Sequence, residues 1–485
     1  MAYSKETATK VYRDSRGLHE CNRTTSNEKD DAPLMLLGTQ QINAEGHLEI
    51  GGCDTTRLAA EFGTPLYVMD EAAIRANCRA YLTAFAARYP RNEICYASKA
   101  FLTLAMAALV AQEGMSMDVA SLGELHVALE AGFPPERLSL HGNNKSKAEL
   151  QAALDAKVGH IIVDNFYELE MLAALVRGSS SRTNILIRAT PGVDPHTHRL
   201  IRTGQADTKF GFNITDGSAL AAVKQALALP ELKFRGIHCH IGSQLLDAET
   251  HAEAVTIMVR LIESIRDEAG ATVDVLNIGG GLGVRYLASH QPPGYDEFAE
   301  RITTPLKAAL DAAGLPYPLL QQEPGRSLVG EAGTTLYTIG AIKTVPIADA
   351  PGTRTYASID GGLSDNPRPQ LYEAVYECLL ANRASDPADS TITIAGKHCE
   401  TDILIWNAKL AQPVPEDLLA VQTTGAYNFV MASNYNRFLR PAVVLVADGD
   451  AQIIVERQTL EDLTRGERVP SHLRGAVAAA HTSAV

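Results

Sequence analysis

The feature that most constrains the fold is a repeated alternation of short apolar runs with longer helix-like segments. Eight runs rich in Val and Ile are spread along the first two thirds of the chain: Ile94–Ser98, Met117–Ala120, Leu138–His141, His160–Val163, Ile185–Ala189, Phe234–His240, Val273–Ile278 and Pro318–Gln322. Amphipathic stretches rich in Ala and Leu lie between most of them, and this strand–helix alternation predicts a parallel sheet. The runs do not alternate strictly with polar residues, as expected for strands that are covered on both faces.

The spacing of these runs favours one architecture. Eight strands within about 230 residues come close to the roughly 250 residues typical of a (β/α)8 barrel. We therefore predict an α/β fold with a TIM-like barrel over residues 61–325, and a doubly wound parallel sheet is the alternative. After Gly325 the runs become short and are separated by Gly, Pro and Asp, which predicts a second, mostly β domain of the sandwich or barrel type over residues 326–485.

The first 60 residues differ from both domains. Residues 37–60 contain a hairpin-like segment that we expect to add strands to the β domain, and residues 1–36 are expected to form a flexible polar arm. This arm has no apolar core for a secretory signal and too many acids for a transit peptide. The seven cysteines are odd in number and lack a Cys-x-x-Cys pair, which predicts reduced thiols in a cytoplasmic protein, with neither disulfides nor a metal site.

Charge and hydropathy exclude two classes of partner. The net charge of −14 argues against nucleic acid, because binding a phosphate backbone needs clustered Lys and Arg. No stretch approaches the roughly 18 uninterrupted apolar residues of a membrane helix, so no membrane partner is expected. A local basic pocket that binds one small anion is still compatible with this negative net charge.

Chemistry-bearing residues stand where the predicted strands end, which is where barrel enzymes gather their catalytic groups. They are Lys99, Asp118, His238, His240, Glu323 and Arg326. A lysine directly after a buried strand is costly unless it is neutral, paired or covalently used. The seventh strand ends in Gly279-Gly280-Gly281, whose backbone amides can approach an anion closely.

This set of groups matches the needs of pyridoxal phosphate. The cofactor requires a lysine for a Schiff base, anion donors for its phosphate and a partner for its pyridine nitrogen. Lys99 provides the first, and the loops after strands seven and eight, where such barrels often bind phosphate, provide the glycine run and Arg326. Glu323 is the natural partner for the pyridine nitrogen, and the ring of His240 can pack on the face of the cofactor.

Several longer stretches carry a resemblance to a known family. They are YASKA (96–100), MDVASLGEL (117–125), HGNNKS (141–146), TGQADTKFG (203–211), IHCHIGSQ (237–244), NIGGGLG (277–283), EPGR (323–326), NPRPQLYEA (366–374), HCETD (398–402) and TGAYNFVMASNYNRFLRP (424–441). On these residues the chain resembles the diaminopimelate decarboxylases, within the alanine-racemase-like class of pyridoxal-phosphate enzymes. The resemblance implies decarboxylation of meso-2,6-diaminopimelate to L-lysine and carbon dioxide, the last step of that route to lysine.

The resemblance also implies roles for individual residues. Lys99 would form the Schiff base and Cys399 would donate a proton after carbon dioxide leaves. The other implied cofactor contacts are Asp118, His240, Ser243, Gly279, Gly280, Gly281, Glu323, Gly325, Arg326 and Tyr427. The implied substrate contacts are Arg326, Arg368, Tyr372, Glu400 and Tyr427. In this family Cys399 and Glu400 reach into the active site of the neighbouring subunit, which implies an obligate homodimer.

One departure and three alternatives stay open at this point. The family usually has Cys-Glu, two small residues and then Asp, but Cys399-Glu400-Thr401-Asp402 is one residue shorter, so the role of Asp402 is undecided. The chain could instead be a decarboxylase of the same class for another basic amino acid or for carboxynorspermidine. It could be a metal-dependent hydrolase with His238 and His240 as ligands, or a cofactor-binding protein without activity. Taken singly, Arg368 would be a surface loop residue and Cys399 a buried thiol.

Overall fold

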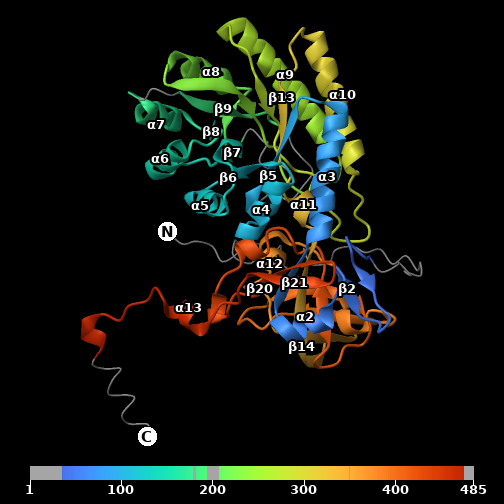
Figure 1. The fold of residues 1–485 in the computed structure, drawn as a ribbon. Helices are drawn as coiled ribbons and strands as arrows, with labels where there is room; N and C mark the ends of the chain where they lie inside the picture. The colour runs from blue at the N-terminus through green and yellow to red at the C-terminus, as the bar shows by residue number, and fades with distance from the viewer. Residues whose placement is uncertain (1–34, 179–181, 194–206, 349, 475–485) are drawn as a thin grey trace, which may run out of the picture. The chain divides into compact units, whose positions relative to one another are not determined.

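The computed structural model describes residues 35–178, 182–193, 207–348 and 350–474 (Figure 1). The arm expected over residues 1–36 lies almost wholly outside these ranges, as does Cys21. Among the described residues, no helix is both long and apolar enough to cross a membrane. The six described cysteines are free thiols.

Parallel strands form a closed barrel, as expected. In sequence order they are β5 (Asn92–Ala97), β6 (Ser116–Val119), β7 (Leu138–Leu140), β8 (His160–Val163), β9 (Thr183–Thr190), β11 (Leu232–His238), β12 (Val275–Asn277) and β13 (Leu319–Gln322). They pair in the order β9-β11-β12-β13-β5-β6-β7-β8, and β8 pairs with β9 to close the ring. This closure confirms the barrel and shows that the doubly wound alternative is wrong. The two-residue strand β10 (Phe212–Asn213) pairs with β9.

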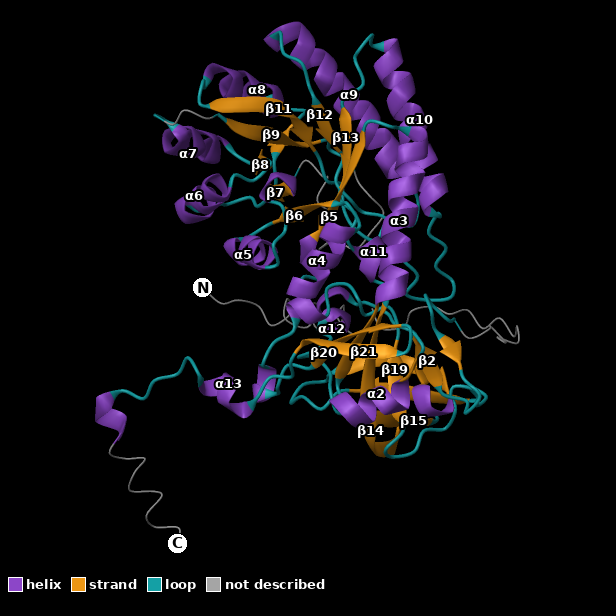
Figure 2. Cartoon of the chain, in the orientation of Figure 1, coloured by secondary structure: helices purple, strands orange, loops and turns teal. Residues whose placement is uncertain are grey.

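Helices surround the barrel strands (Figure 2). They are α3 (Glu71–Arg88), α4 (Leu104–Gln112), α5 (Leu122–Glu130), α6 (Lys147–Ala156), α7 (Phe166–Val176), α8 (Ser218–Ala228), α9 (Glu249–Ala269) and α10 (Tyr295–Ala312). Several of these helices begin at an N-cap residue whose short polar side chain accepts a hydrogen bond from a backbone amide that the first turn leaves unpaired. Ser121 caps α5 in this way, and Ser146 with Glu149 forms a capping box on α6.

The second sheet is mostly antiparallel, and all of its strands except β4 follow the barrel in sequence. Its strands are β4 (Leu66–Asp70), β14 (Gly333–Pro346), β15 (Thr353–Ile359), β16 (Cys378–Leu380), β17 (Ser390–Ala395), β18 (Ile403–Leu410), β19 (Leu418–Val421), β20 (Ala442–Ala447) and β21 (Asp450–Val455). The main path runs β18-β17-β15-β14-β4-β20-β21, and β19 pairs with both β14 and β16. Short helices α11 (Arg326–Val329), α12 (Arg368–Tyr372) and α13 (Leu460–Thr464) interrupt this part of the chain.

The structure differs from the expected boundary at strand β4. This strand lies inside the range expected for the barrel (61–325), yet it pairs with β14 and β20 of the second sheet. Alternate side chains explain its position: Tyr67 and Met69 pack into the barrel-side core, whereas Leu66 and Val68 pack into the core of the β domain. A fully buried strand of this kind does not reveal from its sequence which sheet it joins.

Three short strands precede the barrel. β1 (Gln41–Ile42), β2 (Leu48–Ile50) and β3 (Cys53–Asp54) make a small antiparallel sheet, followed by helix α2 (Thr55–Phe62). They join the β domain by packing rather than by pairing with its sheet, because Leu48 and Ile50 share a hydrophobic core with Leu336 of β14.

Candidate active site

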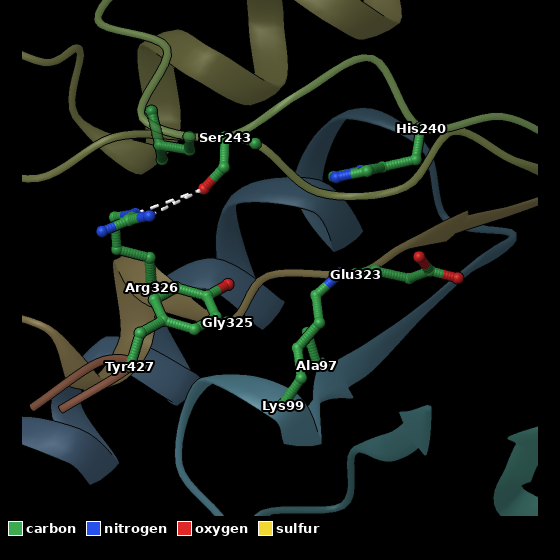
Figure 3. Close-up of a pocket in the computed structure, with 10 residues that line it drawn as sticks. Ala97, Lys99, His240, Ser243, Glu323, Gly325, Arg326 and Tyr427 are labelled. Atoms are coloured by element: carbon green, nitrogen blue, oxygen red, sulfur yellow. Dashed lines mark hydrogen bonds between the residues drawn. The ribbon is translucent and has the colours of Figure 1, made fainter. Parts of the chain in front are cut away.

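A pocket lies at the carboxyl ends of the barrel strands (Figure 3). It is lined by Ala97, Lys99, His240, Ser243, Gly281, Leu282, Glu323, Gly325, Arg326 and Tyr427. All of these except Tyr427 follow strands β5, β11, β12 and β13, so the barrel geometry alone brings them together. Eight of the residues expected to bind the cofactor therefore line one pocket, and Asp118, Gly279 and Gly280 lie beside it.

Lys99 is held at the end of β5 by a short 3-10 turn, η1 (Ser98–Ala100). The carboxylate of Asp118, at the end of β6, accepts a hydrogen bond of 3.0 Å from the Ser98 amide and so fixes this turn. Burial lowers the pKa of the Lys99 amine, but Tyr427, Asp118 and Glu323 raise it by more, and the net shift is upward. Burial, and then the charge of Glu323, raise the pKa of Asp118 to about 7.

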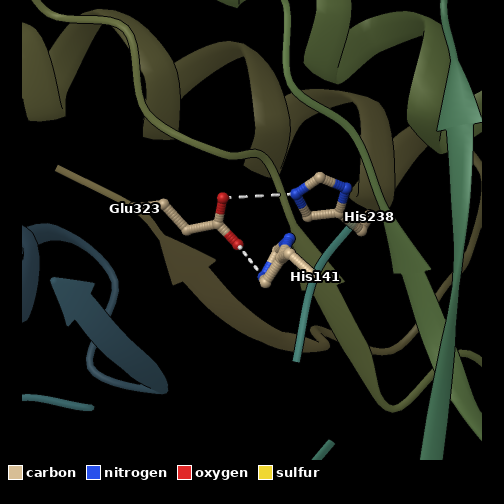
Figure 4. Close-up of side chains that lie close together, drawn as sticks. All are labelled: His141, His238 and Glu323. Atoms are coloured by element: carbon tan, nitrogen blue, oxygen red, sulfur yellow. Dashed lines mark hydrogen bonds and ion pairs between the residues drawn. The ribbon is translucent and has the colours of Figure 1, made fainter. Parts of the chain in front are cut away.

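Glu323 is a buried carboxylate that faces two neighbouring imidazoles (Figure 4). Asn277 donates a hydrogen bond of 2.7 Å to its Oε1, and Nε2 of His141 lies 3.2 Å from the same oxygen. Nε2 of His238 lies 3.3 Å from its Oε2. Burial raises the pKa of Glu323, but the two histidines outweigh it and hold the pKa well below its usual value. The group therefore stays ionised, which suits a partner for a protonated ring nitrogen.

His240 lies two residues beyond His238, past the end of β11. Its Nδ1 accepts a hydrogen bond of 3.3 Å from the Gly280 amide, which fixes the orientation of the ring. Burial, with a smaller effect from Lys99, lowers the pKa of His240 well below its usual value, so the ring is neutral at pH 7. A neutral imidazole on the pocket wall is suited to packing against a flat ring.

The glycine run, residues 279–281, allows strand ends to pack closely and also contributes one residue to the pocket wall. The Gly279 amide donates to Asn277 at 2.9 Å, and the Gly280 amide is used by His240. A Cβ on Gly280 would lie 2.0 Å from the Glu323 carbonyl oxygen, so a side chain there would push two strand ends apart. Of the three glycines, Gly281 is the one that lines the pocket.

Arg326 and Ser243 form the cationic side of the pocket. Nε and Nη2 of Arg326 donate to the Ser243 hydroxyl at 3.2 and 3.1 Å, and Nη1 donates to the hydroxyl of Tyr286. The guanidinium is buried, and its Cζ lies 4.7 Å from the centre of the Tyr427 ring. A buried guanidinium beside a hydroxyl is a ready site for a phosphate.

Arg368 is a second guanidinium against the Tyr427 ring. Its Cζ is 5.6 Å from the centre of that ring and 5.1 Å from the ring of Tyr372, and its Nε donates to the Tyr376 hydroxyl at 3.1 Å. Arg368 is only 5% exposed, so the reading as a surface loop residue is wrong. The Tyr427 amide donates to the Ala100 carbonyl at 2.8 Å, which ties this group of side chains to the turn that carries Lys99.

Cys399 and Glu400 are apart from the pocket of their own chain. They lie in the exposed turn between β17 and β18, and neither lines the pocket. Because Cys399 is exposed, the reading as a buried thiol is also wrong. The Cys399 amide donates to Oδ1 of Asn436 at 2.9 Å, and the Tyr435 hydroxyl donates to Glu400.

The structure adds residues that sequence reasoning missed. His141 and Asn277 both stand at strand ends, so the rule that found Lys99 could have found them. Tyr286 and Tyr376, whose rings meet edge to face at 5.4 Å, had no such signal because they lie far from the strand ends in sequence.

The expected alternative of a metal site at His238 and His240 does not form. Among the described residues, two groups could hold a metal ion: His141 with His238 and Glu323, and Glu45 with His47 and Asp54. His240 belongs to neither, because its ring is bonded to Gly280 and faces the pocket.

A barrel with a buried lysine and a cationic site for a phosphate at its strand ends is typical of pyridoxal-phosphate enzymes. Comparison with known proteins gives the same class. The family model described as "Pyridoxal-dependent decarboxylase, pyridoxal binding domain" matches residues 71–330. Diaminopimelate decarboxylase of Bacillus subtilis is 46% identical over 433 residues, covering 89% of this chain and 98% of that protein. The Synechocystis enzyme of that name is 44% identical, covering 93% and 96%.

Solved structures give the same result. Diaminopimelate decarboxylase of M. jannaschii, in complex with L-lysine, superimposes with a TM-score of 0.83 at 34% identity, covering 90% of this chain and 99% of that one. The Helicobacter pylori enzyme, also with L-lysine, has a TM-score of 0.77 at 30% identity, covering 85% and 98%. The chain belongs to the diaminopimelate decarboxylase family.

Membership of this family implies pyridoxal phosphate, and the pocket residues fit it. Lys99 offers an amine, Glu323 an ionised carboxylate, His240 a flat neutral ring, and Arg326 with Ser243 an anion site. Gly281 also fits, since a Cβ there would lie 2.9 Å from the Gly242 carbonyl oxygen and crowd the pocket wall. These are the groups that the cofactor needs.

Proposed function

We propose that this protein decarboxylates meso-2,6-diaminopimelate to L-lysine and carbon dioxide, with pyridoxal phosphate held in the barrel pocket. The observation that carries the proposal is the pair of buried guanidinium groups, Arg326 and Arg368, which both lie against the ring of Tyr427, a residue that lines the pocket with Lys99. One cation suffices for the phosphate of the cofactor. The second suits a substrate that brings a further carboxylate.

This second cation separates the proposal from its nearest rivals. The distal end of diaminopimelate is a zwitterion, so it needs a cation for its carboxylate and an anion for its ammonium. Arg368 supplies the first and Glu400 supplies the second. A decarboxylase for ornithine or another diamine precursor meets only an ammonium at that end and has no use for a buried arginine. The L-lysine complexes of the M. jannaschii and H. pylori relatives add support, because L-lysine is the product of the proposed reaction.

The residues of the barrel perform four tasks in this proposal. Lys99 would hold the cofactor through its side-chain amine. Glu323, kept ionised, would pair with the pyridine nitrogen, and His240 would cover the ring and exclude water from that face. Arg326 and Ser243 would hold the phosphate. When bound, pyridoxal phosphate supplies an electron sink that stabilises the carbanion left by carbon dioxide.

Cys399 completes the reaction by protonation. The bond electrons stay on the carbon that loses its carboxylate, and that carbon takes the proton of the Cys399 thiol. The thiolate then regains a proton from water. Because Cys399 and Glu400 are exposed and do not line the pocket of their own chain, we propose that they complete the pocket of a second copy in a homodimer.

Purified protein with pyridoxal phosphate and meso-diaminopimelate tests the activity directly. Equal amounts of carbon dioxide and L-lysine are expected, with little turnover of ornithine, lysine or carboxynorspermidine. Absence of L-lysine, or a preference for one of the three rivals, would overturn the assignment.

Co-expression of two inactive variants tests the shared site. Each variant lacks either Lys99 or Cys399. In a dimer of one Lys99→Ala chain and one Cys399→Ala chain, one of the two sites combines the intact Lys99 with the intact Cys399. Activity of about one quarter of the wild type is expected from random pairing. If the mixture stays inactive while both variants fold, the two residues act within one chain.

A further inference from the structure

The turn that carries Cys399 and Glu400 rests on a buried polar pair that no expected role uses. Two exposed residues stand directly beside His398, whose side chain is 0% exposed. The turn is closed by a backbone hydrogen bond of 2.7 Å from the Gly396 amide to the carbonyl of Asp402. Asp402 closes it in a left-handed conformation, with φ of 41°.

Three donors converge on the carboxylate of Asp402. Its Oδ2 accepts from Nδ1 of His398 at 2.6 Å and from the His398 amide at 3.1 Å. Its Oδ1 accepts from the Leu363 amide at 2.8 Å. The Asp402 side chain is 1% exposed, so water does not replace these partners. Its carboxylate therefore clamps the turn to the loop before α12.

The hydrogen-bond chain has a single direction. The Ser364 amide donates to Nε2 of His398 at 3.3 Å, so Nδ1 must carry the ring proton that points at Asp402. An amide at position 402 cannot satisfy this arrangement. In either orientation its NH2 group faces an N–H of His398 or of Leu363, and a buried donor facing a donor is costly.

Two glycines make room for this clamp. A Cβ on Gly396 would lie 1.9 Å from Oδ2 of Asp402, and one on Gly362 would lie 2.3 Å from the same atom. Neither distance can be tolerated, so any side chain at these positions must displace the carboxylate. The φ of Gly396 is not in the left-handed region, so an alanine there perturbs the clamp without straining the backbone.

A second pair of contacts holds the exposed residues from the other side. Asn436 accepts from the Cys399 amide, and the Tyr435 hydroxyl donates to Glu400. The Tyr435 ring also stacks on the ring of His398, with centres 5.9 Å apart and planes inclined by 12°. Cys399 and Glu400 are thus fixed by the buried pair below and by Tyr435 and Asn436 beside them.

We propose that His398 and Asp402 are positioning residues that set the direction from which Cys399 delivers its proton, and that Tyr435 positions Glu400. The proposal rests on the function proposed above and explains what Asp402 does in the shortened turn. A thiol held in one place delivers its proton to one face of the carbon. If the thiol is not held in place, it transfers its proton more slowly. Solvent can then protonate either face of the carbon.

The test uses Asp402→Asn in the full-length holoenzyme, with meso-diaminopimelate in D2O. Wild type should give L-lysine with one deuterium, in one prochiral position, at the carbon that lost its carboxylate. The variant should keep the visible absorbance of the bound cofactor and lose about tenfold or more in kcat, because small misplacements of a reacting group are costly. Its deuterium should be spread over both prochiral positions, which NMR of a chiral derivative measures.

Asp417→Asn is the matched control. Asp417 is also a buried β-domain carboxylate whose partners are all donors, from Asn382, Arg383 and Val414. It should lose similar stability but keep the wild-type kcat and a single prochiral position. Gly396→Ala displaces the Asp402 carboxylate by a different route and should reproduce the Asp402→Asn result, which covers the case in which Asp402→Asn does not fold.

Tyr435→Phe separates the two roles. It keeps the ring on His398 and removes the hydroxyl from Glu400, so KM for diaminopimelate should rise while the prochiral position stays single. Wild-type kcat and stereochemistry in both Asp402→Asn and Gly396→Ala would overturn the proposal. Failure of the wild type to form L-lysine would overturn the proposed function instead.

Discussion

Glu323→Gln tests the electrostatic design of the pocket floor. Glu323 is 6% exposed, and its carboxylate accepts a hydrogen bond from the side-chain amide of Asn277. Nε2 of His141 and Nε2 of His238 lie 3.2 and 3.3 Å from its carboxylate oxygens. Glutamine has nearly the same shape, so its carbonyl can keep the Asn277 hydrogen bond. Its NH2 group, however, would donate a hydrogen bond to the pyridine nitrogen of the cofactor, whereas the carboxylate accepts one from the protonated nitrogen. The substitution would therefore leave that nitrogen without the proton that makes the cofactor ring an electron sink.

The expected magnitude follows from the hydrogen bond that is lost. A hydrogen bond to a charged group contributes about 1.5–3 kcal/mol. At about 1.4 kcal/mol for each factor of ten, kcat should fall by roughly 10- to 100-fold. The affinity for pyridoxal phosphate should fall by less than about tenfold, because a neutral hydrogen bond replaces the charged one.

Two assays separate these effects. Visible absorbance titrated with pyridoxal phosphate gives the affinity, and lysine formation at saturating cofactor gives kcat. Glu93→Gln is the matched control, since Glu93 lies on β5 at the other end of the barrel and accepts from Gln321 at 2.8 Å. It should change neither value. If Glu323→Gln keeps kcat within about threefold of the wild type at saturating cofactor, Glu323 does not act on the ring nitrogen.

Three further predictions follow from other parts of the structure. Lys99→Ala should lose the visible absorbance of the bound cofactor and nearly all turnover, and surviving activity would mean that another group holds the cofactor. Arg368→Gln should raise KM for diaminopimelate by about 10- to 100-fold with unchanged cofactor absorbance, and an unchanged KM would remove Arg368 from the substrate site. Burial raises the pKa of Asp365 from 3.8 to about 7, so its contribution to stability is full below about pH 4 and is lost as pH rises through 7. Relative to Asp365→Asn, the wild type should therefore lose about 4 kcal/mol of unfolding free energy between pH 4 and pH 8. Urea unfolding at several pH values measures this, and a constant difference would contradict the shift.

Much of the pocket could be predicted because the barrel orders it. Parallel strands place all their carboxyl ends on one face, so a lysine, a histidine or a glutamate that follows a strand must reach that face. Lys99, His240, Glu323 and Arg326 were found in this way and line one pocket. The resemblance added Ser243 and Tyr427, which local pattern alone does not single out.

Other features could not be read from local pattern. Strand β4 has buried residues on both faces, so its sequence shows that it is covered but not by which sheet. The two imidazoles beside Glu323 come from strands β7 and β11, and only the closure of the barrel makes them neighbours. Tyr286 and Tyr376 stand in loops, where no periodicity marks them.

The sequence by itself determined the eight strands alternating with helices, the mostly β character of the second domain and the kinds of group at the strand ends, because periodicity and strand-end position are local properties. Only the tertiary structure decided which of those groups touch, which arginine is buried and how the turn of Cys399 is held. These depend on contacts between residues far apart in the chain, and such contacts follow from packing. For this reason Asp402, undecided in the sequence, becomes a buried clamp once Leu363 and His398 are seen to surround it.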